Sequence, residues 1–347
     1  MRHMRSSDLT TIRNLAGLAA TLLLVLGYRQ IEVGALGEIW KSPPPSKVEA
    51  TPTAQPIAAT SRPTTVAPLG QHSYSDRPDD FPGVYQIHVL YVVTRDFSYT
   101  VRDLDGSINE QVRLVGEWFS DQTDSTSLRF DTYQGAPDIT LVVLPVTEGE
   151  LYSFVLQEYG KYDSAFHGLV FLHNGLEHWL DVVDRGSPVF SPGKLYLTYF
   201  ESSFAYVCGD GPVSGSRIIG VYPSAYNLRD KNDCLAFLGE GQDNRRGVWE
   251  HILTHEILHA LGFPASCASN LGADAVHIDD PATPNDIMGS QLGIYDPNPV
   301  LDPNHDDYFM TDKGDCPDLS SSPFLSPLPA DPTIPENVLT NPAWRLP

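Results

Sequence analysis

The sequence WEHILTHEILHALGFPASC, residues 249–267, contains three histidines at intervals of four residues: His251, His255 and His259. Residues four apart lie on one face of an α-helix, so either neighbouring pair can bind one metal ion. Glu256 follows His255, whereas an isoleucine follows His251, so only the second pair adjoins a carboxylate that can act as a general base. We therefore predict that His255 and His259 bind Zn²⁺ and that Glu256 takes a proton from water at the metal.

The predicted helix is longer than the metal site that it carries. Asp243 or Asn244 can cap its start, and Gly262 suits its C-terminal turn. His251 lies about 12 Å from His259 along a helix axis, which would strain a compact site that used all three histidines. We expect His251 to pack inside the protein or to support a ligand.

A catalytic zinc ion needs a third protein ligand, which this helix does not supply. In the spacing HExxHxxGxxH the next ligand would fall at Ala265, which cannot bind zinc. A glutamate from a following helix is another common solution, but the only glutamate after Glu256 is Glu336, near the C-terminus. We prefer His277, because a neutral imidazole binds zinc better than a lone carboxylate. The other candidates are Asp274, Asp279, Asp280, Asp286 and His305.

Four segments within residues 206–319 together resemble a known family: THEILHALGFPASC, AVHIDDPATPNDIMG, LDPNHDDYF and CPDL. They are similar to metzincin-type zinc metalloproteases, and more narrowly to bacterial secreted members with a lengthened loop before the third histidine. The resemblance implies an α/β fold with a mixed twisted sheet, a zinc-binding active-site helix and an irregular, disulfide-tied C-terminal subdomain. It assigns His255, His259 and His277 as ligands, Glu256 as the general base and Met288 as the methionine of the Met-turn.

One position departs from the family's pattern. Gly289 stands where relatives often have a tyrosine that steadies the oxyanion. Tyr295 or Tyr308 can take that role, with packing as the alternative for both. Asp279 or Asp280 can support the third histidine through a hydrogen bond.

A cluster of acidic and amide side chains follows the proposed third ligand. LDPNHDDYF, residues 301–309, places Asp302, Asn304, Asp306 and Asp307 close together. Oxygen ligands at alternating positions can bind Ca²⁺. The alternative is a turn that these side chains stabilise by hydrogen bonds to the backbone.

Length and charge limit the classes of protein. The chain has 347 residues, enough for one large domain, and a formal net charge of −22. Such an acidic surface argues against nucleic-acid binding and is compatible with an extracellular protein.

The composition of the first 80 residues predicts that the protein is exported and can be attached to a membrane or cell wall. Three arginines precede an apolar run, Leu15–Gly27, which is roughly 20 Å long as a helix and shorter than the ~30 Å core of a membrane. Residues 1–40 are predicted to be a cleaved signal peptide, with a membrane anchor at residues 15–27 as the alternative. Residues 41–80, rich in Pro, Thr, Ala and Ser, are predicted to be a disordered linker or stalk on a membrane or cell wall.

The sequence contains four cysteines, Cys208, Cys234, Cys267 and Cys316. An even number in an exported chain predicts two disulfides, for which three pairings exist. We prefer Cys208–Cys234 and Cys267–Cys316, although spacing alone does not decide between the pairings. CGDGP, residues 208–212, is expected to be a turn tied by one of these bonds.

Residues 81–322 are predicted to form one α/β catalytic domain, and residues 323–347 a loose proline-rich tail. The chain after Gly262 is dominated by Pro, Asp, Asn, Ser and Gly, so we expect irregular structure there. Expected strands are 84–93, 128–133, 138–145, 167–174, 194–201 and 216–223, and expected helices are 107–122, capped by Ser107 with Glu110, and 148–162.

These expectations combine in an extracellular zinc endopeptidase that acts on a protein or peptide substrate. The substrate can extend the sheet along residues 217–223 by β-augmentation. Two other classes remain open. One is a non-proteolytic zinc amidase acting on the cell wall, and the other is a stalked adhesion or binding domain that keeps the metal for stability.

Overall fold

The structure of the chain is a computed structural model. The residues that it describes are 71–97, 101–159, 165–202, 205, 207–211, 215–224, 226–227, 232–234, 248–289 and 298–347. The predicted export segment and residues 41–70 of the predicted linker lie outside these ranges, as do Asp243, Asn244 and Tyr295. Within the described ranges, no helix is long and apolar enough to cross a membrane.

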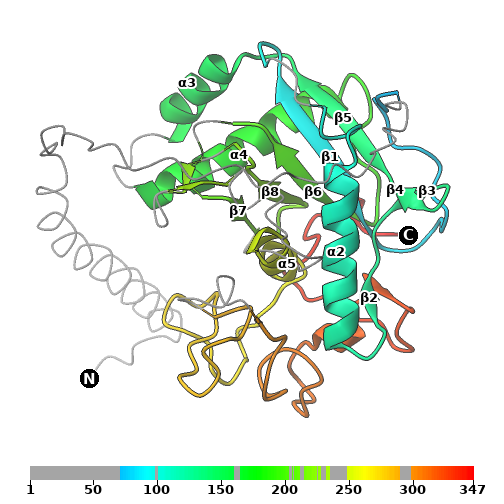
Figure 1. Ribbon diagram of the computed structural model, residues 1–347, viewed down its shortest axis with the longest axis vertical. Helices are drawn as coiled ribbons and strands as arrows, with labels where there is room; N and C mark the ends of the chain where they lie inside the picture. The colour runs from blue at the N-terminus through cyan, green and yellow to red at the C-terminus, as the bar shows by residue number, and fades with distance from the viewer. Residues whose placement is uncertain are drawn as a thin grey trace, which may run out of the picture. The chain divides into compact units, whose positions relative to one another are not determined.

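A five-stranded sheet forms the centre of the fold, with the order β5-β1-β6-β8-β7 (Figure 1). Four strands are parallel, and β7 runs antiparallel to β8 at the edge. Every residue of β1 and of β6 is buried, which is typical of parallel strands covered on both faces. The strands are β1 (Gln86–Thr94), β5 (Ile139–Leu144), β6 (Lys194–Phe200), β7 (Gly209–Asp210) and β8 (Ile218–Val221).

Helices cover both faces of this sheet. Helix α2 (Ser107–Gln122) connects β1 to β5, whereas α3 (Glu148–Tyr159) and α4 (Ala165–Asp184) connect β5 to β6 in the opposite direction. Right-handed crossovers therefore place α2 on one face and α3 and α4 on the other. Helix α5 (Val248–Ala260) lies beside α2, where Trp118 contacts His251 with ring centroids 6.0 Å apart (Figure 1). The predicted α/β class is confirmed.

Two local predictions were wrong. Residues 167–174 were predicted to be a strand, but they lie in α4, where Leu172, Leu176 and Leu180 are buried at the four-residue spacing of a helix. A short apolar run does not distinguish a strand from a buried helix segment. Ser107 was predicted to cap α2, but the N-cap is Gly106 and its position has no side-chain hydrogen bond.

The remaining elements are short. Leu325 and Ser326 pair antiparallel with residues 127–128, so the C-terminal segment is joined to the chain that follows α2. The short elements are β2 (Ser127–Leu128), β3 (Thr132–Tyr133), β4 (Ala136–Pro137), β9 (Tyr226–Asn227), β10 (Asn232–Asp233) and β11 (Leu325–Ser326), with 3-10 turns at Leu319–Ser321 and Pro342–Trp344.

The proline-rich segment 323–347, which we expected to be loose, packs against the domain. Phe324, Leu325 and Leu339 are buried, and the carbonyl of Trp344 accepts a hydrogen bond of 2.5 Å from the amide of Gly193. Proline lacks a backbone hydrogen-bond donor, which limits regular structure in this segment. Burial of the apolar side chains between the prolines nevertheless stabilises its packing against the domain.

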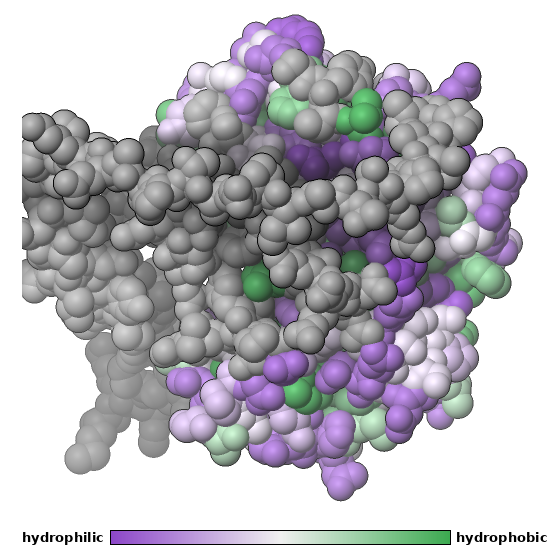
Figure 2. All heavy atoms as spheres, in the orientation of Figure 1, coloured by the Kyte–Doolittle hydropathy of each residue, from purple (hydrophilic) through white to green (hydrophobic). Residues whose placement is uncertain are grey.

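One face of the described part of the chain carries mainly polar residues. Figure 2 shows mostly hydrophilic residues on this face, with hydrophobic ones scattered among them. This agrees with the formal net charge of −22.

A buried lysine connects the end of the predicted linker to the sheet. The Lys194 ammonium donates to Asp76 at 2.8 Å, to Asp79 at 2.7 Å and to Asp131 at 2.7 Å. Asp131 also contacts Nδ1 of His88 at 2.5 Å. Residues 76–79 therefore belong to the folded domain, because their carboxylates neutralise a cation that lies in the core.

Replacing Lys194 by methionine should destabilise the protein by about 3–5 kcal/mol, because it leaves buried carboxylates without their cation. Urea unfolding at neutral pH measures this loss. Arg113→Ala is the control, since Arg113 forms exposed ion pairs with Glu110 and Glu117 that contribute about 0–1 kcal/mol. Equal, small losses in the two variants would contradict the assigned role of Lys194.

Candidate metal centre

Helix α5 ends in a turn that orients one of its histidines. The amide of Gly262 donates to the carbonyl of His259 at 2.9 Å, and the amide of Phe263 donates to that of Leu258 at 3.0 Å. This pair of bonds is a Schellman motif, which requires a residue with positive φ, and Gly262 has a φ of 90°. The turn brings the Phe263 carbonyl to Nδ1 of His259, which donates to it at 3.2 Å.

Two imidazoles of α5 face each other. Nδ1 of His255 donates to the carbonyl of Ile287 at 2.7 Å, as Nδ1 of His259 does to Phe263. Burial, followed by repulsion from His277, lowers the pKa of His255 to about 4, so the ring is neutral at neutral pH. A neutral imidazole carries one N–H, so each Nε2 presents a lone pair. The two Nε2 atoms are 3.0 Å apart, and their lone pairs repel unless a cation lies between them.

His277 reaches the same point from a loop. Its ring stacks on that of His255 with centroids 5.2 Å apart, and ligand nitrogens of His255, His259 and His277 all lie within 4.8 Å of one another. Nδ1 of His277 contacts the Asp274 carboxylate at 2.7 Å, which leaves Nε2 as the free ligand atom. Asp274 therefore supports this histidine. The predicted supports were Asp279 or Asp280.

The segment around Met288 holds the histidine loop in place. The amide of Ile278, the residue after His277, donates to the Met288 carbonyl at 2.8 Å. Met288 is fully buried, and the preceding residue, Ile287, provides the carbonyl that orients His255. One short segment thus contacts two of the three histidines or their immediate neighbours.

Glu256 lies on the same helix in a buried position. Burial raises the pKa of Glu256 to about 8, and the charge of Asp210 adds to the rise, whereas a hydrogen bond from the Gly211 amide opposes it. A carboxyl group whose pKa is near neutral pH can both accept and release a proton at that pH.

Strand β7 lies directly on α5 at this point. A β-carbon at Gly209 would lie 2.9 Å from Cγ of Glu256, and one at Gly211 would lie 2.5 Å from Cβ of His259. Asp210 points to the other face of the strand, where it contacts His173 and Tyr222 at 3.1 Å. The segment CGDGP, residues 208–212, was predicted to be a turn tied by a disulfide. Its alternating glycines were the signal for the close approach of a helix.

The other predicted site residues lie elsewhere. His251 is buried against Trp118, in agreement with the packing role expected for it. Nδ1 of His305 contacts the Phe309 carbonyl at 3.2 Å, and this residue is not part of the histidine group. Tyr308 is fully buried, and its hydroxyl donates to Asp286 at 2.7 Å, so it is not available to a substrate.

The predicted calcium cluster is only partly assembled. Asn304 contacts Asp280 at 3.4 Å, and Asp306 contacts the Asn270 amide group at 3.3 Å. Of the four predicted residues, only Asp302 and Asp307 lie in a group of carboxylates that could share one ion, and the third member is Asp286.

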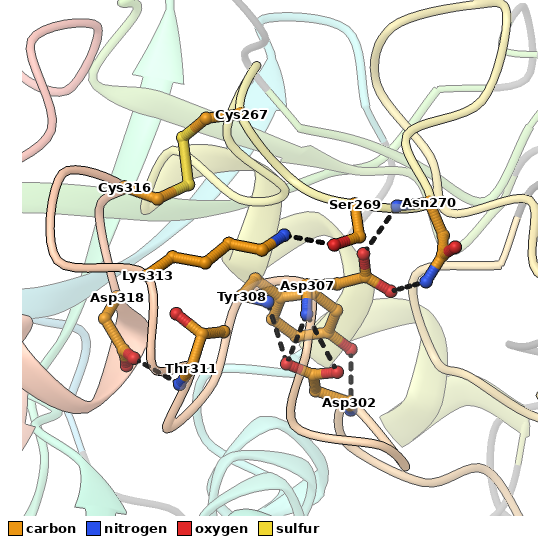
Figure 3. Close-up of a disulfide and its surroundings, with 10 residues drawn as sticks. All are labelled: Cys267, Ser269, Asn270, Asp302, Asp307, Tyr308, Thr311, Lys313, Cys316 and Asp318. Atoms are coloured by element: carbon orange, nitrogen blue, oxygen red, sulfur yellow. Dashed lines mark hydrogen bonds between the residues drawn. A yellow bond between two sulfur atoms is a disulfide. The ribbon is translucent and has the colours of Figure 1, made fainter.

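Both preferred disulfide pairings are present. Cys208 and Cys234 are bonded with Cα atoms 5.4 Å apart, and Cys267 and Cys316 with Cα atoms 5.8 Å apart. Figure 3 shows the second bond linking the loop after α5 to the segment that precedes Asp318. It closes the irregular C-terminal region, which lacks helices and strands over its described residues 261–289 and 298–318.

Comparisons with known proteins give only distant similarity. No protein-family model matches the chain, and no curated protein is similar to it. Among solved structures, catalytically inactive OgpA from Akkermansia muciniphila, in complex with an O-glycopeptide substrate, has a TM-score of 0.38 and 15% identity over 65% of this chain. Wild-type OgpA in two crystal forms has TM-scores of 0.36 and 0.37, also at 15% identity, over 65% and 68% of this chain. The chain spans 59–62% of the length of these structures.

Replacing Gly211 by alanine should disturb the centre, because the new methyl would lie 2.6 Å from the Glu256 carbonyl oxygen, which is backbone. We expect a loss of about 1–3 kcal/mol in urea unfolding and weaker metal binding. Gly116→Ala in α2 is the control. No atom lies within 4 Å of its β-carbon position, so it should raise stability by about 0.4–1 kcal/mol. A fully stable Gly211→Ala variant would refute the close packing of β7 on α5.

Proposed function

We propose that the protein is an extracellular zinc-dependent endopeptidase with a metzincin-like catalytic domain. The observation that carries this proposal is the group of three imidazoles, His255, His259 and His277. Glu256 follows His255 on the same helix and is buried. Two disulfides support an oxidising location outside the cytoplasm.

The donor set fits zinc. Three imidazole nitrogens, on rings whose other nitrogens are bound to acceptors, are a common protein contribution to a catalytic zinc site, where the fourth position is left for water or substrate. Calcium and magnesium prefer oxygen ligands, so this nitrogen cluster selects against them. The facing lone pairs of His255 and His259 also need a cation at the point where zinc would lie.

Zinc in this site would act as a Lewis acid on a scissile carbonyl and make a nearby water molecule more acidic. Glu256 would take the proton of that water and pass it to the leaving amine. Burial raises the pKa of the Glu256 carboxyl to about 8. A nearby cation favours the charged form of a carboxyl group, so a bound metal would lower the pKa of Glu256 and favour the carboxylate that acts as a base.

Three features support the metzincin-like assignment. The glycine after the second histidine forms the turn at the end of α5, as the motif requires. The third histidine comes from a loop beyond that glycine, and Met288 is buried in a segment whose backbone is hydrogen-bonded to Ile278, the residue after His277. The proposed catalytic domain extends beyond residues 81–322, because residues 72–80 and 323–347 pack against it.

The proposed substrate strand lies along β7. The sequence predicted that the substrate extends the sheet at residues 217–223, which include β8. However, β8 pairs with β6 on one side and with β7 on the other, so it has no free edge for a substrate strand. Strand β7 ends the described sheet and lies over Glu256, so its outer edge is the better template for an extended peptide.

Two rival functions use the same residues. A zinc amidase that acts on cell-wall bonds would share the metal centre, so only substrate profiling separates it from an endopeptidase. A stalked adhesion domain would keep the metal for stability, and it would not need the carboxylate of Glu256.

Digestion of a general protein substrate tests the proposal. Glu256→Gln should lower kcat by about 10²–10⁴-fold, because it removes the general base while keeping the shape of the side chain. Removing metal with a chelator should abolish activity, and adding zinc back should restore it. Glu250→Gln is the matched control, since Glu250 is similarly buried on the same helix, and it should keep activity. Proteolysis that survives both Glu256→Gln and chelation would exclude the proposed mechanism.

The third ligand has its own test. His277→Ala should lower the zinc content of purified protein well below one per chain, because two imidazoles bind zinc too weakly for a stable site. His305→Ala removes a histidine from the same region that lies outside the group, and it should keep full zinc content. Zinc measured by atomic emission, with circular dichroism to check folding, distinguishes the two outcomes. Unchanged zinc in His277→Ala would assign the ligand elsewhere.

A further inference from the structure

Three carboxylates meet in the irregular region, and none of them belongs to the histidine group. Asp286, Asp302 and Asp307 are 0%, 0% and 2% exposed, and one oxygen of each lies within 4.8 Å of the others. Carboxylates at this distance repel one another strongly when they are buried and ionised.

The protein fixes each of these carboxylates in place. Asp302 accepts the amides of Tyr308 at 2.7 Å and Phe309 at 2.6 Å, and Asp307 accepts the amide of Asn270 at 2.7 Å. Figure 3 shows Asp302 and Asp307 in this network beside the Cys267–Cys316 disulfide. Backbone donors hold the carboxylates together but do not supply the full positive charge that would balance them.

The strongest sign of a ligand is one oxygen of Asp286. Its Oδ1 accepts the amide of Met288 and the hydroxyl of Tyr308, both at 2.7 Å. Its Oδ2 is buried and has no hydrogen-bond partner in the described structure. An unpaired buried oxygen costs about 1–3 kcal/mol, and more when it is charged, so an ion there would offset a real penalty.

The other acidic group has a lysine that balances its charge. Asp76, Asp131 and Asp138 lie with His88 in a comparable cluster, and the Lys194 ammonium binds two of these carboxylates. No lysine, arginine or histidine of the described ranges forms an ion pair with Asp286, Asp302 or Asp307. Burial, and then the charges of Asp302 and Asp307, raise the pKa of Asp286 to about 7.

We propose that Asp286, Asp302 and Asp307 bind a calcium ion. The donors are all carboxylate oxygens, which hard divalent cations prefer, and calcium accepts the irregular geometry of a loop better than magnesium does. Zinc would favour the imidazole nitrogens of the other centre. The proposed ion is therefore a second, separate metal, and its binding does not depend on the proposed peptidase function.

Calcium at this point would connect three segments that lack regular structure. Asp286 immediately precedes Ile287, whose carbonyl orients His255. Asp307 contacts Asn270 in the disulfide loop, and Asp302 organises the chain from Asp306 to Phe309. The ion would thus stabilise the region under the histidine group, as a metal often does where a core is small.

Calcium binding to the full-length protein tests this site. Protein stripped of metals and reloaded with zinc should bind about one Ca²⁺ in equilibrium dialysis. Its Tm should rise by roughly 5–10 °C at a hundredfold excess over Kd. Asp286→Asn should weaken calcium binding by at least about tenfold, because it removes one ligand charge. Asp307→Asn serves as a second variant if the first one does not fold.

Asp318→Asn is the matched control. Asp318 accepts the amides of Met310, Thr311 and Ser320 in the same region, but it lies outside the group of three (Figure 3). It should therefore bind calcium as the wild type does, and zinc content, measured in all variants, should stay unchanged. Absence of calcium binding by the wild type at about 10 mM, above the range of weak extracellular sites, would overturn the proposal. Equal calcium affinity in wild type and Asp286→Asn would overturn it as well.

Discussion

The candidate metal centre depends on two carbonyl oxygens, those of Phe263 and Ile287. Each accepts a hydrogen bond from Nδ1 of one histidine of α5, and this decides which nitrogen of each ring is free. The two Nε2 lone pairs then face each other at 3.0 Å, an arrangement that is unfavourable without a cation. The turn at Gly262, the Met288 segment and the loop of His277 can all be understood as the parts that keep these rings in place.

Buried charge explains much of the remaining architecture. Around Asp131 the acidic side chains are neutralised by Lys194, which also anchors residues 76–79 to the sheet. Around Asp286 the described residues supply only neutral hydrogen-bond donors. A protein with a formal net charge of −22 has many more carboxylates than cationic side chains. In the cluster around Asp131 the chain provides the balancing cation, and in the cluster around Asp286 its described residues do not.

The irregular half of the domain is stabilised by contacts between segments and hardly at all by regular secondary structure. A disulfide joins Cys267 to Cys316, and apolar residues of the segment 323–347 pack under the end of α5, where the β-carbon position of Gly262 lies 2.9 Å from Pro335. Composition alone predicted a loose tail because proline and polar residues dominate it. The few apolar side chains between them determine the packing, since they are the ones that lose contact with water.

The sequence by itself determined the features that depend on neighbours along the chain. The spacing of His255, Glu256 and His259 sets their common place on a helix, and helical or strand periodicity predicted α2, β1 and β6 correctly. Only the tertiary structure decided which distant groups join them. Asp274 lies beside His277, Gly209 and Gly211 lie against α5, and Asp286 meets Asp302 and Asp307. No local sequence pattern relates these residues to one another. The spacing of apolar residues predicts which face of a helix or strand is buried. Which residues contact that face depends on how the whole chain packs.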